Sequence, residues 1–136
     1  MKKTERNYNA VVKNSSKELS KREKLKITTL SDAQSLEEPV NVAKENAVDF
    51  IITPAQWAIV DIHNERSKGA KDYTTLVIID KDGFKYKTSS DSFINAFIDI
   101  WDGMTEDGSE EEFEIKIFGL PAKNYSGKYF LTCAII

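Results

Sequence analysis

TSSDSFINAFIDIWDGM, residues 88–104, is the stretch of sequence that decides the fold. Ser89 or Ser90 can cap the first free backbone N–H groups, and Asp91 places a carboxylate in the first turn, where the helix dipole favours it. Asp102 and Gly103 are expected to end the helix. Apolar side chains recur at spacings of three and four, which predicts one helix whose aromatic face belongs to the core: Phe93, Phe97, Ile100, Trp101 and Met104.

Strand-like runs precede this helix. Residues 57–63 (WAIVDIH) alternate between two faces, and residues 73–80 (YTTLVIID) are rich in β-branched side chains. Residues 84–88 (FKYKT) return after Asp82-Gly83, a pair that accepts the positive φ angles of a tight hairpin. A shorter apolar run, 48–52, ends at Thr53-Pro54. We therefore expect three main strands before the helix.

Two further strands are expected after the helix. Residues 105–112 form an acidic loop, and residues 113–118 (FEIKIF) alternate cleanly. Residues 119–128 (GLPAKNYSGK) contain proline, asparagine and glycine, which is typical of a long hairpin connection. Residues 129–136 (YFLTCAII) are apolar on both faces and should form a central strand.

This order of elements is three strands, one helix and two strands. It is the order of the oligonucleotide/oligosaccharide-binding (OB) fold, in which five strands form a partly open barrel and the helix lies between the third and fourth strands. Small barrels and rolls of other topology share the same order. We predict a mainly β domain, an OB-like β-barrel with one helix, over residues 47–136.

Residues 1–46 are predicted to form a basic N-terminal extension that is partly mobile or folds only when bound. Residues 1–30 carry nine Lys or Arg and three Glu, and residues 34–45 show no sustained apolar period. Ser20 and Glu23 have the spacing of a helix-capping box, but residues 24–27 can equally alternate as a strand.

Composition limits the class of protein. With 136 residues, 40 % apolar and 30 % charged, the chain is long enough for one globular domain. No apolar run approaches the roughly 20 residues that span a bilayer, and no apolar segment follows the basic N-terminus as in a secretory signal. We expect a cytoplasmic protein that does not contact a membrane. The net charge of -3 includes seven acids and no base between residues 102 and 114.

The sequence argues against an enzyme, a cofactor or a metal site. His63 and Cys133 are the only histidine and cysteine, and both metal centres and nucleophilic sites need more partners. Cys133 lies in an apolar strand and is expected to be buried. No glycine-rich phosphate loop is present, and the acidic run 106–114 lacks the ligand alternation of a calcium loop.

A binding surface is better supported. In the OB fold, ligands contact the second and third strands and the loops joining strands one to two and four to five. In this chain those regions are basic, and they contain aromatic rings on which unpaired bases can stack. Trp57 and Tyr73 can equally belong to the core. The candidate nucleic-acid-binding residues are Trp57, Arg66, Lys68, Lys71, Tyr73, Lys85, Lys87, Lys123, Asn124, Tyr125 and Lys128.

Four segments also resemble a known family: residues 1–23, VDIHNE at 60–65, the block 72–104, and KNYSGKYFLTCAII at 123–136. Together they are similar to small single-stranded DNA-binding proteins of phages and mobile elements of Gram-positive bacteria. The resemblance implies an OB fold and a role in replication or recombination in the host bacterial cytoplasm. Bacterial members of the family end in an acidic tip, whereas this chain ends in an apolar strand.

We therefore predict a single-stranded DNA-binding protein of a phage or mobile element, with little sequence preference. Its partners would be single-stranded DNA and, through the acidic segment 102–114, replication or recombination proteins, and a homo-oligomer fits this role. The alternative is a protein-interaction or inhibitor module that uses segment 102–114. A weaker reading is a protein that binds RNA or duplex through its basic arm.

Overall fold

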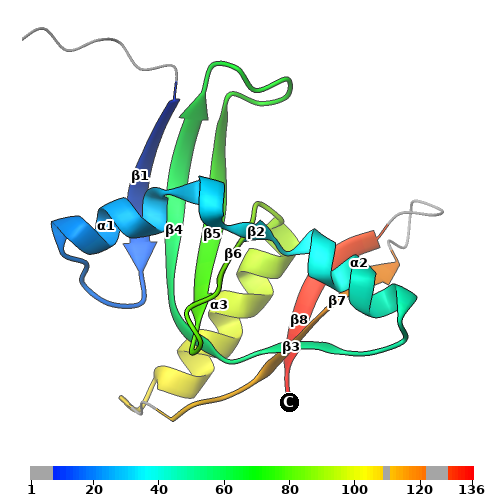
Figure 1. Cartoon of the computed structure of the whole chain (residues 1–136). Coiled ribbons are helices and arrows are strands. Elements are labelled where there is room, and N and C mark those ends of the chain that lie inside the picture. The colour runs from blue at the N-terminus through cyan, green and yellow to red at the C-terminus, as the bar shows by residue number, and fades with distance from the viewer. Residues whose placement is uncertain (1–7, 109–110, 122–128) are drawn as a thin grey trace, which may run out of the picture.

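The computed structural model describes residues 8–108, 111–121 and 129–136. Over these residues the protein is mainly β, with eight strands in two sheets and three α-helices (Figure 1). The strands are β1 (Tyr8–Ser15), β2 (Gln34–Ser35), β3 (Phe50–Ile52), β4 (Pro54–Asn64), β5 (Asp72–Asp80), β6 (Lys85–Thr88), β7 (Ile115–Pro121) and β8 (Tyr129–Ile135). The helices are α1 (Lys21–Thr28), α2 (Glu37–Glu45), α3 (Asp91–Thr105) and a 3-10 turn, η1 (Leu30–Asp32).

The first sheet has the strand order β1-β4-β5-β6-β2. β4 and β5 form a long antiparallel hairpin that projects beyond the rest of the molecule, and β1 runs antiparallel along it (Figure 1). The short β2 pairs in parallel with β6. One edge of this sheet is therefore the 8-residue β1, and the other is the two-residue β2.

The second sheet has the order β3-β7-β8, and both of its pairings are antiparallel. Only Thr53 separates β3 from β4, so the chain passes from one sheet to the other at this residue. The two sheets do not close into a barrel, because β6 pairs with β2 in the described residues. β8 lies at an edge, so the prediction of a central last strand is wrong; an apolar strand can sit at an edge when α3 packs against it.

The central helix confirms the prediction from residues 88–104. The Ser90 hydroxyl accepts a hydrogen bond from the Phe93 N–H at 3.3 Å, and α3 follows. Phe93 and Phe97 are completely buried in the first core, where Trp101 packs edge-on against Trp57. The helix passes the predicted stop at Gly103 and ends two residues later at Thr105, and Met104 in this added part packs against the core.

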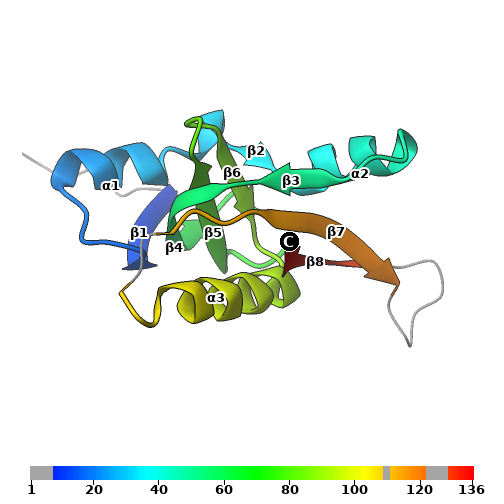
Figure 2. The same cartoon turned by 90° about the horizontal axis from the view of Figure 1, so that it is seen from below.

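The first sheet separates two cores, and Figure 2 shows α1 and α3 on its opposite faces. On the α3 side lie Trp57 and the inward residues of β5 to β8. On the α1 side, Ala58, Val60 and Ile62 of β4 pack against Ile27. Both faces of β4 are therefore covered by packed side chains at residues 57–60. The alternation of apolar residues alone did not reveal this.

The predicted boundary at residue 46 is corrected by the packing of residues 8–46. β1 pairs with β4, α1 packs on β1 and β4, and Leu36 at the start of α2 is completely buried in the first core. Ser20 and Glu23 form the capping box, which selects the helix over the alternative strand at residues 24–27. These residues are an integral layer of the domain.

The hairpin turn between β5 and β6 is confirmed. Gly83 has φ of +89°, and the Asp80 carboxylate accepts hydrogen bonds from the Asp82 and Phe84 N–H groups at 2.9 Å. β6 begins only at Lys85, so Phe84 belongs to the turn and is 63 % exposed while Tyr86 is buried. Cys133 is buried as expected, and burial raises the pKa of its thiol to about 12.

Candidate nucleic-acid interface

Lys85 holds the N-terminal segment onto the first sheet. Its ammonium group donates to the Lys26 and Thr29 carbonyl oxygens at 2.6 and 3.1 Å and to the Asp32 carboxylate at 2.8 Å. The side chain is only 11 % exposed, and the bond from Lys85 lowers the pKa of Asp32. The three oxygens use the donors that a phosphate would need, so Lys85 is removed from the candidate site.

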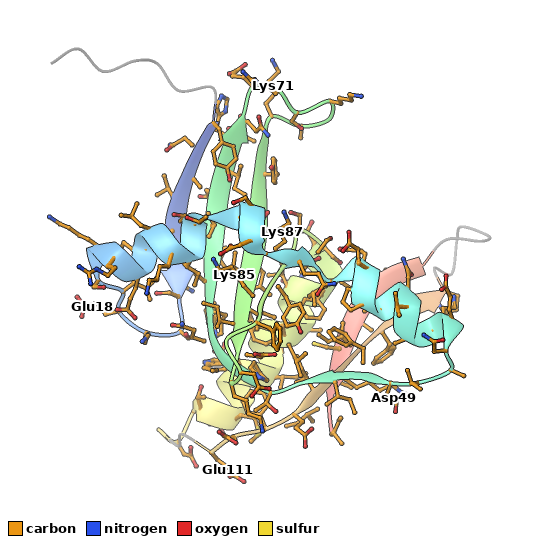
Figure 3. The ribbon with its side chains drawn as sticks, in the orientation of Figure 1. Glu18, Asp49, Lys71, Lys85, Lys87 and Glu111 are labelled. Atoms are coloured by element: carbon orange, nitrogen blue, oxygen red, sulfur yellow. The ribbon has the colours of Figure 1, made fainter. Side chains whose placement is uncertain are left out.

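Trp57 is also removed, because it is 4 % exposed and its ring packs edge-on against Phe97 and Trp101. A base cannot reach either side of this ring. Lys87 is half-buried, and its ammonium group makes one described contact, at 3.4 Å to the Leu30 carbonyl oxygen, where Lys85 makes three. Figure 3 shows Lys85 and Lys87 beneath the segment that joins α1 to α2.

The hairpin loop, residues 65–71, stands at the far tip of β4 and β5, where Figure 3 labels Lys71. Lys71 is paired with Glu65 at 3.1 Å, so part of its charge is neutralised. Arg66 and Lys68 are exposed, and among the described residues no salt bridge involves either of them. They are therefore the cations of this loop best placed to meet a phosphate.

His63 anchors the base of the same loop. Its Nδ1 lies 2.7 Å from the Asp72 carboxylate and its Nε2 lies 2.6 Å from the Glu65 carboxylate. These two bonds, Asp72 first and Glu65 second, raise the pKa of His63 above its ordinary 6.5. Both ring nitrogens act as donors only in the imidazolium form, so protonation completes the arrangement.

We expect the loop to be less stable at alkaline than at mildly acidic pH. Because the folded pKa of His63 is raised, its contribution is complete below the unfolded pKa near 6.5 and is lost as pH rises through the folded value. The native protein should be more stable than His63→Gln at mildly acidic pH, and this difference should shrink as pH rises through the folded-state pKa of His63. The single imidazole resonance, followed by NMR, should titrate with a midpoint above 6.5; a midpoint at or below 6.5 would contradict the two contacts.

Two tyrosines share one face of the projecting hairpin. Ala10 lies opposite Ile62, and Ile62 lies opposite Tyr73, so these side chains are on the same side of the sheet, and Tyr8, two residues before Ala10, joins them. Tyr8 is 41 % exposed. Burial, and after it the neighbouring Tyr73, raises the pKa of the Tyr8 phenol. We call this side of the sheet, with exposed Tyr8, half-buried Ala10 and Tyr73 and buried Thr75, the tyrosine face; Tyr73 also packs against the core on the α1 side.

The tyrosine face continues into a hollow of about 270 Å³ beside η1 and β2. Tyr73, Thr75 and Lys87 line it, and the Thr75 hydroxyl lies 2.7 Å from the Ser89 hydroxyl at its far side. The structure thus brings together Tyr73 and Lys87 from the predicted set. Tyr8 was missed because it precedes the region read as folded, although the alternation of Tyr8, Ala10 and Val12 was a strand signal.

The remaining predicted residues fall elsewhere. Lys123, Asn124, Tyr125 and Lys128 lie outside the described residues. The described residues of the acidic segment 102–114 lie at the opposite end of the molecule from Lys71: α3 ends among them, and Figure 3 labels Glu111 there. Glu111, Glu112 and Glu114 line a hollow of about 400 Å³ with the last residues of the chain. The basic loop and the acidic segment are therefore well separated.

No group of three or more His, Cys, Asp or Glu side chains in the described residues could hold a metal ion. None of the described helices is long and apolar enough to cross a membrane. Comparisons with models of protein families, with curated proteins and with solved structures found no match to this chain.

Proposed function

We propose that this protein binds single-stranded DNA without strong sequence preference, in the replication or recombination of a phage or mobile element. The observation that carries the proposal is the tyrosine face, with Tyr8 and Tyr73 near the base of loop 65–71 and with Tyr73 and Lys87 lining the same hollow. Aromatic rings near cations at the margin of a sheet suit an unpaired strand, because bases stack on the rings and phosphates meet the cations.

The strand topology supports an OB-like core as part of the proposal. Around the molecule the strands follow the order β8-β7-β3, then β4-β5-β6 after the passage at Thr53. That is the strand order of an OB barrel left open between its third and fifth strands, with α3 after the third strand. In such a barrel the second strand and the loop before it bind ligand. Here these are β5, which carries Tyr73, and loop 65–71.

Charge favours the tyrosine face over the opposite face of the hairpin. The opposite face carries Asp61 and Asp72 beside His63, and the Thr74 hydroxyl donates to Asp61 at 3.0 Å. Two carboxylates would repel a phosphate chain. The tyrosine face has no carboxylate on β4 or β5 near Tyr73; the Glu37 carboxylate lies at the rim of the neighbouring hollow, where it accepts hydrogen bonds from the Ser35 and Thr88 hydroxyls. We infer that the strand runs from loop 65–71 across Tyr73 towards Lys87.

Replacing Tyr73 by alanine is expected to weaken binding of labelled oligo(dT) by about 1–3 kcal/mol, roughly fivefold to more than a hundredfold, because one stacking ring is lost. Tyr8→Ala should act in the same direction. The measurement is fluorescence anisotropy at low and moderate salt, with a duplex of equal length as competitor.

Two matched controls separate stacking from damage to the fold. Tyr73→Phe keeps the ring and should retain most of the affinity. Phe84→Ala removes an exposed ring in the turn at the other end of β5 and should leave affinity unchanged. Absence of oligo(dT) binding at low salt would refute the proposed function. Normal oligo(dT) binding that is insensitive to both tyrosines would instead place the site elsewhere.

A further inference from the structure

The outer edge of β1 is an open edge of the first sheet. β1 stands last in the strand order, so over Tyr8–Ser15 its outer backbone groups have no strand partner in the described part of the chain. At the end of the strand, the Asn14 carboxamide oxygen accepts the Ser15 N–H at 2.9 Å. The register of β1 against β4 shifts between Val12 and Asn14, and Lys13 lies at this irregularity, so the unprotected part of the edge is residues 8–12, which contain no proline and no charged side chain.

A groove runs along this open edge. α1 projects beyond β1 (Figure 1), and between them lies a hollow of about 450 Å³. The side chains of Ala10 and Val12 form its floor, the backbone of Val11 lies between them at the edge, and α1 forms its wall, where Leu25 is 70 % exposed. An extended peptide added to β1 would therefore gain main-chain hydrogen bonds at the edge and apolar contact with α1.

The rim of the groove is basic. Lys21 and Lys24 of α1 line it, both are exposed, and among the described residues no salt bridge involves either. The groove contains no aromatic ring, so it offers nothing on which a base could stack. The groove therefore combines an apolar floor, an open backbone edge and a basic rim. An extended peptide with apolar and acidic side chains would complement all three.

We propose that this groove binds an extended protein segment in which apolar and acidic residues alternate, paired as a strand with β1. A second copy of this chain is a poorer occupant. Antiparallel pairing of two β1 strands would bring two α1 helices together on one face, with Lys21 and Lys24 of each copy facing those of the other. This inference does not depend on DNA binding, because the groove shares only Ala10 with the tyrosine face.

The test uses the full chain and two synthetic peptides. The probe is a labelled peptide of alternating glutamate and valine, and the comparison peptide has lysine at each glutamate. We expect the acidic peptide to shift the NMR amide signals of β1 and α1 and to slow hydrogen exchange in β1. Lys21→Glu with Lys24→Glu should weaken its binding by about tenfold. The matched control Lys68→Glu, in loop 65–71, should have no effect.

Four outcomes would overturn the inference. The acidic peptide fails to bind, or the lysine peptide binds equally well. Alternatively, sedimentation shows a dimer that Val11→Lys dissociates, which would assign the edge to a second copy. Finally, the Lys21/Lys24 variant weakens oligo(dT) binding without any peptide binding, which would assign the rim to nucleic acid. Tyr73→Ala should leave peptide binding unchanged, so failure of the proposed function and failure of this inference are distinguishable.

Discussion

Leu36→Ala is expected to reduce the free energy of unfolding by about 2–5 kcal/mol, the usual cost of removing a completely buried leucine and leaving a cavity. Leu36 is fully buried, and it packs in the first core with Val40 of the same helix and with side chains from both sheets. Its N–H also donates to the Lys87 carbonyl oxygen at 3.0 Å, which fixes the start of α2 on β6. A residue of a loosely attached extension would show no such loss.

The measurement is urea unfolding followed by tryptophan fluorescence, since Trp57 and Trp101 both contact this core. Val42→Ala is the matched control, because Val42 lies on the same helix and is 56 % exposed. It should change stability by less than about 0.5 kcal/mol. Equal effects of the two substitutions would show that α2 does not contribute to the core.

The second large effect is expected at Lys85. Lys85→Glu should reduce the free energy of unfolding by about 1–3 kcal/mol, because the acceptors around the largely buried ammonium group lose their donor. The new carboxylate would face the Lys26 and Thr29 carbonyl oxygens and Asp32, and all of these are acceptors. Repulsion replaces three hydrogen bonds.

The stability of Lys85→Glu distinguishes a lysine that holds the fold together from a lysine that binds DNA. Lys81→Glu, an exposed lysine in the neighbouring turn, is the control and should leave stability nearly unchanged. Oligo(dT) affinity of the folded fraction of Lys85→Glu should remain close to that of the native protein. A stable Lys85→Glu variant with lost DNA affinity would instead restore Lys85 to the binding site.

The sequence predicted those elements whose signals are local. Ser90 and the apolar spacing after it predicted α3, and the Asp82-Gly83 pair predicted the turn at positive φ. Each depends on a few adjacent residues and on backbone sterics, so tertiary context did not override it. For the same reason Cys133 could be assigned to the interior from its apolar neighbours.

What could not be predicted depends on contacts between distant residues. α1 buries only Ile27, and β2 has two residues, so neither has a periodicity to detect; both are stabilised by packing on the first sheet. Lys85 and Lys87 alternate correctly on β6, but the sequence does not reveal that residues 26–32 lie over them. The candidate site therefore moved from the middle of the sheet to its projecting end, where Tyr8 joins Tyr73.

The passage of the chain from one sheet to the other at Thr53 has a consequence for synthesis on the ribosome. All five strands of the first sheet lie within residues 8–88, so they can pair before β7 and β8 have been made. β3 must wait for its partner, because Phe50 pairs with Ile117. Until α3 and β7 arrive, the side of the nascent sheet that carries Trp57 and Ile78 faces solvent, and a chaperone or a slow-moving ribosome would have most influence in that interval.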